Sequence, residues 1–462
     1  MTDLLAHADP AAALLAALAR GGDFADVFAE EKTSTLIEID SEKVDRLVQG
    51  RRAGAGVRVI HDFRTAYSYT DDFSPAALRD CAAIASAAAQ DGAATRPIAL
   101  GRPVEHSLPV ARMPDSLSVR ERLDLLFRAD RAARAVDRRV RQVRVVYADT
   151  LRRIAVANSS GLYVTDLAQY LVIYVEVVAS DENGLQVAHE SLGGARGLEL
   201  FDERSPEEAA VLAARRAVRN LTAAPAPAGT MAVVLAAEAG GTMVHEAVGH
   251  GLEADLAEQG LSVYADRVGE RIASPLITVL DDATVPGRRG TFSVDDEGTA
   301  AERTVLVDEG ILRDYMFDLR LGMKKGCSST GNGRRESYGH PPIVRMTNTM
   351  IAPGETPPED IINSVDRGLY VRRMGGGEVN TVNGDFVFEV EDGCLIERGE
   401  LGPAVRGATL TGNGPRVLME IDLVGSDLGF GMGTCGKDGQ GVPVADAQPT
   451  LRIPEIVIGG RV

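Results

Sequence analysis

The sequence predicts an α+β protein of two domains: a mixed α/β domain over residues 1–222, and a β-rich domain over residues 231–462 built around one central helix. Three observations support this prediction. A chain of 462 residues exceeds the usual size of one domain. Helical and strand patterns are mixed in the first half, whereas short strands and glycine-rich turns dominate the second. Between the halves, Leu221–Thr230 (LTAAPAPAGT) has the prolines and small residues of a linker.

The elements of the first half follow from residue spacing. The apolar stretch near the N-terminus predicts an amphipathic helix rather than a signal peptide, because an acidic residue instead of basic ones precedes it. Alternating and β-branched residues predict strands at Ser34–Asp40, Gly56–Tyr69, Val140–Ala148, Arg152–Asn158, Gln169–Ala179 and Leu185–Ser191. Helical spacing predicts helices at Ser74–Gln90, Ser116–Val136 and Pro206–Asn220.

The composition argues against several classes of protein. A formal net charge of −18 speaks against binding to nucleic acid or anionic membranes, since phosphate contacts need clustered lysines and arginines. No apolar run approaches the roughly 20 residues of a membrane-spanning helix. The four cysteines lie far apart and form no C-x-x-C pair, a pattern typical of a reducing compartment. We therefore expect a cytoplasmic protein whose partners are neither nucleic acid nor membrane.

The central helix of the second half carries the most distinctive motif. After a predicted buried strand at Met231–Ala236, the segment Gly240–Asp255 contains His245, Glu246 and His250. Two imidazoles and an adjacent carboxylate are the groups that a hydrolytic zinc site needs, the imidazoles as ligands and the carboxylate as base. The pattern is H-E-x-x-x-H, one residue longer than the H-E-x-x-H of many zinc proteases.

The extra residue constrains the geometry of the helix. On a regular helix five residues advance about 500°, so His250 would point roughly 140° away from His245. Both rings reach one ion only if the helix bulges or ends between them. Gly249 and Gly251 flank the second histidine, and glycine tolerates such a distortion.

Spacing alone leaves two questions open. The third ligand is one: Glu253, Asp255 and a distant cysteine are all candidates. The other is whether a metal binds at all, since two histidines and a glutamate also occur as hydrogen-bonded polar residues on an ordinary helix.

Two later stretches gather polar residues. Asp295–Glu297 form an acidic turn, which we expect to be solvated rather than catalytic. Ser328–Asn348 places His340 and Arg345 among prolines and glycines. Donors of this kind can line a cleft and stabilise an oxyanion, and a plain polar loop is the alternative.

Two further stretches are rich in glycine. The segment after Gly375 predicts hairpins whose exposed edges would take a peptide by β-augmentation, unless they are paired within the sheet. Gly429–Gly441 places Cys435 and Lys437 in a loop where a thiolate near a cation is a candidate metal ligand or nucleophile. A packed cysteine is the alternative, and the residue order of a nucleotide-binding loop is absent.

Four of these motifs, taken in order, resemble those of the TldD-like members of the TldD/PmbA family of metalloproteases. They are HEAVGHGLEAD, FSVDDEGT, STGNGRRESYGHPPIVRMTN and GMGTCGKDGQGVPV, spread over most of residues 231–450. The first half of the chain matches the family only in general layout. The resemblance implies an α+β fold with a β-rich C-terminal domain around the metal-binding helix.

The resemblance also implies a site and an activity. It implies a zinc ion held by His245, His250 and Cys435, with Glu246 as catalytic acid and base, in a peptidase that acts on peptides or unfolded proteins. It implies assembly with a PmbA-like subunit as a heterodimer, or with a second copy as a homodimer. PmbA-like subunits lack the zinc motif, whereas this chain contains all four residues.

These expectations combine into one hypothesis and one alternative. We expect a zinc-dependent peptidase in which His340 and Arg345 hold the oxyanion or the substrate backbone. The alternative is a peptide-binding or assembly subunit with a structural zinc and no turnover of its own. A closed four-ligand site that uses Glu253 or Asp255 would favour this alternative.

Overall fold

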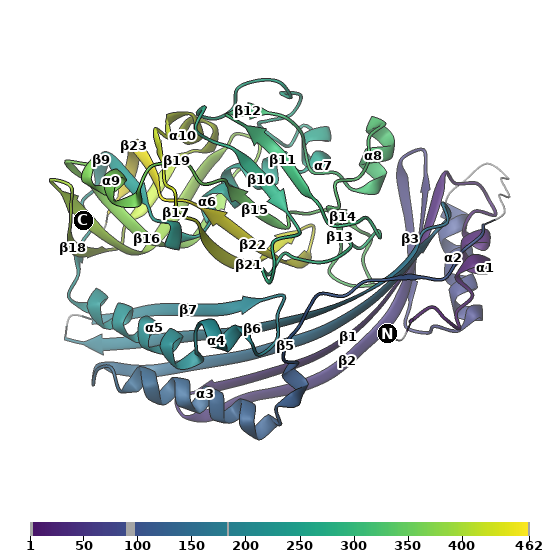
Figure 1. Ribbon diagram of the computed structural model, residues 1–462, viewed down its shortest axis with the longest axis horizontal. Coiled ribbons are helices and arrows are strands. Elements are labelled where there is room, and N and C mark those ends of the chain that lie inside the picture. Colours follow the sequence, from purple (N-terminus) through teal and green to yellow (C-terminus); the bar gives the residue numbers. More distant parts are fainter. Residues whose placement is uncertain (1–2, 89–97, 183, 461–462) are drawn as a thin grey trace.

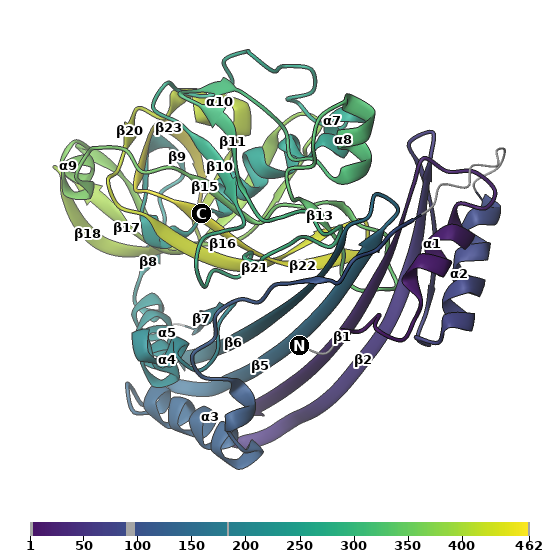
Figure 2. The same ribbon diagram turned by 45° about the vertical axis from the view of Figure 1, so that its right-hand side comes forward.

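Long antiparallel strands form the N-terminal part of the protein (Figure 1). The computed structural model describes residues 3–88, 98–182 and 184–460. The strands are β1 (Phe24–Asp40), β2 (Lys43–His61), β3 (Arg64–Thr70), β4 (Val104–Glu105), β5 (Val140–Asn158), β6 (Tyr163–Asp181) and β7 (Gly184–Gly194). Within the described residues they form one sheet in the order β3-β2-β1-β5-β6-β4, with β7 also paired to β6. The sheet curves around one side of the C-terminal part (Figures 1 and 2).

Helices cover one face of this sheet at both of its ends. Near one end lie α1 (Pro10–Ala17) and α2 (Pro75–Ala88), and near the other lie α3 (Val119–Arg134), the short α4 (Leu200–Glu203) and α5 (Pro206–Leu221). Ser118 and Ser205 cap α3 and α5 through capping boxes. The period of two along β5 produces two different faces: Val145 packs under the helices, whereas Ile154 packs against the C-terminal part.

Most predicted elements of the first half are present. The three predicted helices correspond to α2, α3 and α5, although residues 89 and 90 of the first prediction lie outside the described residues. The prediction of one strand over Gly56–Tyr69 is wrong, because a turn at Asp62 and Phe63, both with positive φ, separates β2 from β3. Alternation continues through this tight turn, so the pattern does not reveal it. The two strands predicted within residues 140–158 are one continuous strand, β5.

A five-stranded barrel forms one half of the C-terminal part. Its strands are β9 (Gly229–Leu235), β16 (Arg367–Val379), β17 (Asp385–Glu397), β19 (Thr409–Asn413) and β23 (Leu451–Gly459). They pair in the order β16-β9-β23-β19-β17, and β17 pairs back to β16. The short strands β8 (Ala224–Pro225), β18 (Glu400–Arg406) and β20 (Leu423–Val424) extend this sheet.

A second sheet packs with the barrel around one hydrophobic core. Its strands are β10 (Val279–Asp282), β11 (Arg303–Asp308), β12 (Ile311–Leu312), β15 (Asn348–Ile351), β21 (Gly429–Lys437) and β22 (Gln440–Gln448). Their order is β12-β11-β10-β15-β22-β21, so β21 is an edge strand. Short elements surround them: η2 (Ala237–Ala239), α7 (Ala254–Glu258), α8 (Leu319–Lys325), α9 (Pro358–Asn363), α10 (Gly414–Glu420), and the pair β13 (Gly333–Arg334) and β14 (Ile343–Val344). The predicted α+β fold with a β-rich C-terminal half is confirmed.

The predicted linker passes between the two parts. The last helix of the N-terminal part, α5, ends at Leu221, and the first long strand of the barrel, β9, begins at Gly229. Between them β8 pairs with β18, so the segment also attaches to the sheet of the C-terminal part.

Buried ion pairs join the N-terminal sheet to the C-terminal part. Arg58 on β2 contacts Asp26 on β1 and, at 2.6 Å, Glu297. Arg152 on β5 contacts Asp296 at 2.8 Å. Since Asp296 and Glu297 are 3% and 1% exposed, the expectation of a solvated acidic turn is wrong. Its arginine partners lie far away in the sequence, 239 residues in the case of Arg58, so local composition does not reveal them.

Two observations bear on the expected compartment. The four cysteines, all within the described chain, are free thiols. None of the described helices combines the length and the apolar character needed to cross a bilayer.

Candidate metal centre

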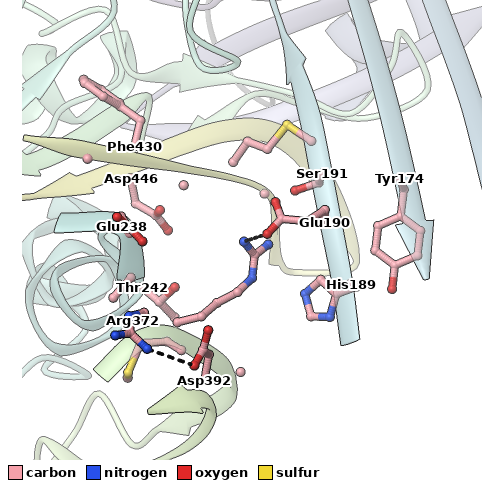
Figure 3. A pocket seen from close by; sticks show the side chains of 18 of the residues that line it. Tyr174, His189, Glu190, Ser191, Glu238, Thr242, Arg372, Asp392, Phe430 and Asp446 are labelled. Carbon is pink, nitrogen blue, oxygen red and sulfur yellow. Dashed lines mark hydrogen bonds and ion pairs between the residues drawn. The ribbon is translucent and has the colours of Figure 1, made fainter. Parts of the chain in front are cut away.

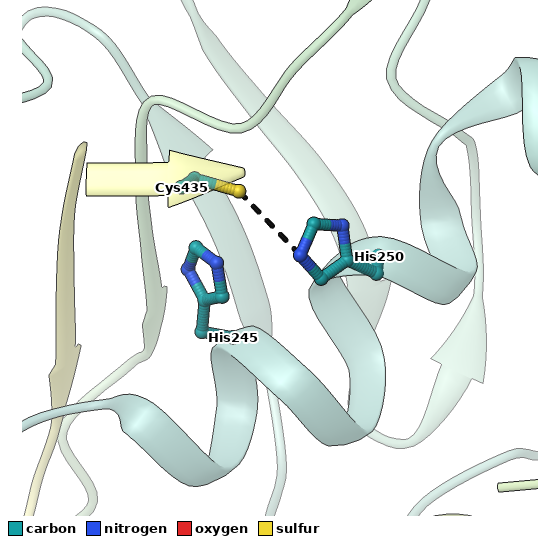
Figure 4. Close-up of side chains that lie close together, drawn as sticks. All are labelled: His245, His250 and Cys435. Carbon is teal, nitrogen blue, oxygen red and sulfur yellow. Dashed lines mark hydrogen bonds between the residues drawn. The ribbon is translucent and has the colours of Figure 1, made fainter. Parts of the chain in front are cut away.

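A π-helical turn lies between the two histidines. The short helix α6 (Thr242–Val244) continues into the π-helix η3 (His245–Gly249), and the backbone N–H of His250 donates to the carbonyl of His245. A 3₁₀ turn, η4 (His250–Leu252), follows. An i→i+5 turn places residues five apart on nearly the same face, so both rings project to the same side (Figure 4). The bulge that the spacing required is therefore present.

Side chains from the following loop satisfy carbonyls of this distorted helix. The hydroxyl of Tyr264 donates to the carbonyl of Ala247 at 2.9 Å, and the hydroxyl of Ser262 donates to the carbonyl of Gly251. A buried carbonyl left without a partner costs about 1–3 kcal/mol. The loop thus helps to stabilise the irregular backbone that brings the histidines together.

The two glycines of the motif permit close packing. A Cβ on Gly249 would lie 2.1 Å from Sδ of Met346, and one on Gly251 would lie 2.7 Å from the ring of Tyr264. Gly249 has an ordinary helical φ of −53°. Its role is therefore close packing against a neighbour, rather than the unusual conformation that the sequence suggested.

The three ligands implied by the resemblance lie together (Figure 4). Sγ of Cys435, on β21, is 3.4 Å from Nε2 of His250. The rings of His245 and His250 are perpendicular, with centroids 5.1 Å apart. Each residue offers one ligand atom within 4.8 Å of the other two, and no fourth histidine, cysteine or carboxylate joins this group among the described residues. A tetrahedral zinc ion would separate a nitrogen from a sulfur ligand by about 3.5 Å, so the donor set fits one ion.

Glu253 orients His250 from the side opposite Cys435. Oε2 of Glu253 lies 2.9 Å from Nδ1 of His250, which leaves Nε2 facing the sulfur. Nζ of Lys437 lies 3.2 Å from Glu253 and 2.6 Å from Asp255. Both carboxylates considered as third ligands are therefore engaged by Lys437. A carboxylate behind a histidine is the usual arrangement around a metal ligand, because it fixes the tautomer and the ring orientation.

Burial and mutual interactions shift the pKa values of the ionisable groups in this centre. Burial opposes ionisation of the Cys435 thiol, but hydrogen bonds from His245 and His250 outweigh it and lower the thiol pKa to about 5. The thiolate, which is the form that binds metals, is therefore favoured at neutral pH. Burial raises the pKa of Glu246, although the neighbouring histidines partly oppose this shift.

A cavity of about 320 Å³ opens beside this cluster. Glu246 lines it together with His245, His250 and Cys435, and Asp446 of β22 lines it as well. Asp446 accepts a hydrogen bond from the backbone N–H of Gly241, and burial raises its pKa. Sequence reasoning missed this aspartate. The available signal was an acidic residue inside the otherwise apolar strand VPVADA.

The cavity adjoins a larger groove of about 860 Å³ between the two parts of the protein (Figure 3). Thr242, Met432, Gly433, Thr434 and Asp446 line both spaces. The groove is bounded by His189 and Glu190 of β7, by Arg372 and Gly375 of β16, and by Phe430 of β21. The glycine-rich segment after Gly375, singled out in the sequence as a peptide-binding candidate, therefore lies in the wall of this groove.

The remaining two predicted site residues, His340 and Arg345, make their contacts outside the metal cavity. Arg345 is fully buried and donates to the carbonyls of Cys435 and Gln440. His340 lies 3.0 Å from the hydroxyl of Ser337, and its carbonyl faces Arg335. Neither His340 nor Arg345 is among the described residues that line the metal cavity. The structure thus brings Glu246 to the cluster but directs Arg345 at the backbone that carries Cys435.

Comparison with known proteins finds related metallopeptidases. Three family models match the chain: PmbA/TldA metallopeptidase domain 1 at residues 25–89, the central domain at 112–221, and the C-terminal domain at 228–460. The Metalloprotease TldD homolog of Haemophilus influenzae is 38% identical over 419 residues, covering 88% of this chain and 86% of that protein. A metalloprotease of Methanothermobacter thermautotrophicus is 34% identical over 438 residues, covering 95% and 96%.

Solved structures share the fold at lower identity. A Thermotoga maritima protein, described provisionally as a modulator of a DNA gyrase, superposes with a TM-score of 0.79 at 21% identity and covers 94% of this chain and 96% of its own. TldE from Thermococcus kodakarensis gives a TM-score of 0.73 at 19% identity, with 95% and 97% covered. At these identities the likeness concerns the fold alone. With matches to all three family models and the identity to the named metalloproteases, this chain belongs to the PmbA/TldD family of metallopeptidases.

Proposed function

We propose that this chain is a zinc-dependent peptidase that hydrolyses peptides and unfolded proteins. The observation that carries the proposal is the convergence of His245, His250 and Cys435 on one point beside Glu246. Imidazole and thiolate ligands suit zinc. Three protein ligands leave one coordination position for water or substrate, as catalytic zinc sites require.

The residues around the ion have distinct roles in this proposal. When bound, zinc would supply Lewis-acid chemistry that lowers the pKa of water and polarises the peptide carbonyl. Glu246 accepts the proton of the attacking water and then delivers it to the leaving amine. The raised pKa of Glu246 suits both steps, because a base that titrates nearer to neutral pH is also a competent acid. Glu253 keeps Nε2 of His250 free for the metal.

We assign Arg345 to positioning rather than to the oxyanion. Its guanidinium donates to the carbonyl of Cys435, so it fixes the strand that presents the thiolate. His340 stabilises the loop before β14 through Ser337. Thr242 and Asp446, which line the cavity, are better placed to approach a bound substrate.

Sheet edges suggest how a peptide binds. β21 is the edge strand of its sheet, runs along the groove and carries Cys435. Within the described ranges, β7 pairs on one side only, and residues after Met374 of β16 pair with β17 but not with β9. An extended substrate can pair its backbone with such an edge, which gives affinity with little sequence preference. We therefore propose β21, rather than the hairpin after Gly375 alone, as the main peptide-binding strand.

The alternative function is a peptide-binding or assembly subunit with a structural zinc. It would need a closed site with a fourth protein ligand. The engagement of Glu253 and Asp255 by Lys437 weighs against it. A PmbA-like partner or a second copy of this chain, in the cytoplasm, stays part of the proposal. Size measurement of the protein, alone and after co-expression with a PmbA-like chain, tests this assembly.

Cleavage of one protein before and after unfolding tests the proposed function. A small disulfide-bonded protein provides both forms: it is folded with its disulfides intact and unfolded after reduction and alkylation. The unfolded form should be cleaved and the folded form spared, because only an extended chain can pair with a strand edge. Metal chelation should abolish cleavage, and added zinc should restore it. Equal cleavage of both forms would contradict the peptide mode, and cleavage that survives full metal removal would contradict the metallopeptidase mechanism.

A further inference from the structure

A second, smaller pocket lies beside β21, with Thr434 in its lining. Its volume is about 260 Å³, and it is bounded by β5 and β6 of the N-terminal sheet and by the loops around Phe292 and Arg334. Thr434 lines this pocket, the groove and the metal cavity alike. Arg289 lines both the pocket and the groove. The three spaces are thus arranged around the strand that carries Cys435.

More basic than acidic residues line this pocket. Its basic residues are Lys32, Arg152, Arg289, Arg334 and Arg335, and its acidic residues are Asp295, Asp296 and Glu336. Arg152 is paired with Asp296, and Lys32 with Glu30. Burial, together with the neighbouring Glu297, raises the pKa of Asp295 well above its usual value. Positive charge therefore exceeds negative charge in an enclosed space.

Three arginines of this pocket, Arg289, Arg334 and Arg335, form no ion pair within the described residues, and Arg335 donates instead to the carbonyl of Asp296 at 2.9 Å. Nε of Arg289 donates to the carbonyl of Gly433 at 3.0 Å, and its Nη2 lies 3.4 Å from the hydroxyl of Thr434. Arg334 is buried and donates to the carbonyls of Met346 and Pro443 at 2.6 and 2.7 Å. These bonds use only some of the five N–H donors that each guanidinium carries.

Other arginines near the junction of the two parts do have carboxylate partners. Arg58 and Arg152, which are equally close to the junction, each contact two carboxylates. Burial lowers the pKa of both Arg289 and Arg334, and nearby Tyr170, joined by Asp296 at Arg334, opposes the shift only in part. A buried cation without a partner is costly, so a fold keeps one where a ligand supplies the missing negative charge.

Strand geometry connects this pocket to a substrate. Side chains of neighbouring strand residues alternate in direction, and Cys435 lines the metal cavity. The preceding residue, Thr434, lies where the metal cavity, the groove and this pocket adjoin. A peptide paired with β21 alternates in the same way. A substrate residue next to the cleaved bond would therefore extend towards Arg289 and Arg334.

We propose that this pocket binds a carboxylate of the substrate peptide, held by Arg289 and Arg334. The proposal rests on the peptidase function proposed above. The carboxylate comes from an aspartate or glutamate side chain, or from the C-terminus of the peptide. A guanidinium binds either in the same way, through paired N–H donors. The site thus adds a preference for acidic substrates to an otherwise sequence-tolerant, backbone-pairing enzyme.

Matched peptides test this preference. In a first set of pairs, one member has glutamate and the other glutamine at a single position near the cleaved bond, and each position is tested in turn. In a second pair, one member has a free C-terminus and the other an amidated C-terminus. The zinc-loaded wild type should cleave the charged member with a kcat/KM about ten- to a hundredfold higher, as expected for a charge-assisted hydrogen bond. A preference in the first pair assigns the pocket to a side chain, and one in the second pair assigns it to the C-terminus.

Variants of Arg289 test whether this residue causes the preference for a charged substrate. Arg289→Gln should bring the charged-to-neutral ratio close to one, and Arg289→Lys should restore part of it. Arg416→Gln removes an exposed arginine of α10 and should leave the ratio unchanged. The ratio compares two substrates on one protein, so a general loss of activity does not affect it. A wild type without preference, or a preference that persists in Arg289→Gln, would overturn the proposal while leaving the peptidase function intact.

A binding measurement separates this proposal from the peptidase function. N-acetylglutamate should raise the thermal unfolding temperature of the wild type more than N-acetylglutamine does, and Arg289→Gln should abolish this difference. The measurement needs no turnover. If the two compounds raise the unfolding temperature of the wild type equally, the proposal of a carboxylate pocket is wrong, whatever the peptidase assay shows. If the difference is found but no peptide is cleaved, the proposed function fails and the pocket is not a substrate site.

Discussion

Glu253 lies 2.9 Å from Nδ1 of His250, on the side of the ring opposite Cys435. This contact decides between two roles for a buried carboxylate near a metal site. Glu253 is fully buried, and the positive charge of Lys437 favours its ionised form. It therefore accepts a hydrogen bond from Nδ1–H of His250 and leaves Nε2 available. The arrangement makes Glu253 an orienting residue behind the ligand rather than a ligand.

Glu253→Gln is therefore expected to weaken metal binding without abolishing it. The glutamine keeps the size of the side chain but loses the charge that orients the ring, and such changes typically cost about 10–100-fold in affinity. Competition with a metal-binding dye measures the change. His250→Ala should lose the metal altogether, and Glu258→Gln, which changes a residue paired with Lys324, should bind like the wild type. A loss as complete as that of His250→Ala would make Glu253 a ligand.

The assignment of the third ligand leads to a second prediction. Purified protein should contain about one zinc ion per chain, and Cys435→Ala or His245→Ala should lose it, because two ligands hold the ion far less well than three. Elemental analysis after gel filtration measures the content. Asp255→Asn, which changes the other carboxylate beside Lys437, should retain the metal. Full metal content in Cys435→Ala would mean that another residue completes the site.

Part of this centre could be predicted from sequence and part could not. The five-residue spacing of His245 and His250 implied a bulge, because only an irregular helix places both rings on one face. The proximity of Cys435 could not follow from local pattern, since it comes from an edge strand 185 residues after His250. The residues made Cys435 one candidate ligand among several, and only the resemblance to a family placed it with the two histidines. Glu253 looked like a candidate ligand because the sequence does not show Lys437 beside it.

The fold, too, could be predicted from the sequence only in part. The helices α3 and α5 were predictable, since serine caps and helical spacing are local signals. The acidic turn around Asp296 was misjudged, because its burial depends on Arg58 and Arg152 of a distant sheet. Long-range charge pairing leaves no local pattern in the sequence, whereas capping and periodicity do.

The buried ion pairs predict a large effect on stability. Arg58→Met leaves Asp26 and Glu297 buried without their cation, and breaking a buried pair in this way costs about 3–5 kcal/mol. Urea unfolding followed by far-ultraviolet circular dichroism measures the change, since the chain has no tryptophan. Arg51→Met, which changes a largely exposed partner of Glu31, should cost less than about 1 kcal/mol. Similar losses in the two variants would show that burial of the Arg58 pairs contributes little.

The pH dependence of catalysis follows from Glu246. The base must be ionised, so kcat/KM should rise with pH through the pKa of Glu246, and burial places that pKa above the usual value for glutamate. The zinc content should be measured in each sample and the range kept above pH 5, because protonation of Cys435 near its pKa of about 5 would release the metal. A kcat/KM that stays constant down to pH 5 at full zinc content would argue against Glu246 as the base.

The most direct test of the account compares Glu246→Gln with the wild type at equal zinc content. The substitution keeps the size and hydrogen-bonding capacity of the side chain but removes the proton acceptor. Zinc and peptide binding should persist, while turnover of an unfolded substrate falls by roughly 10²–10⁴-fold. Hydrolysis by zinc-loaded Glu246→Gln at the wild-type rate would contradict the proposed mechanism, because the proton would then have to be accepted by another group.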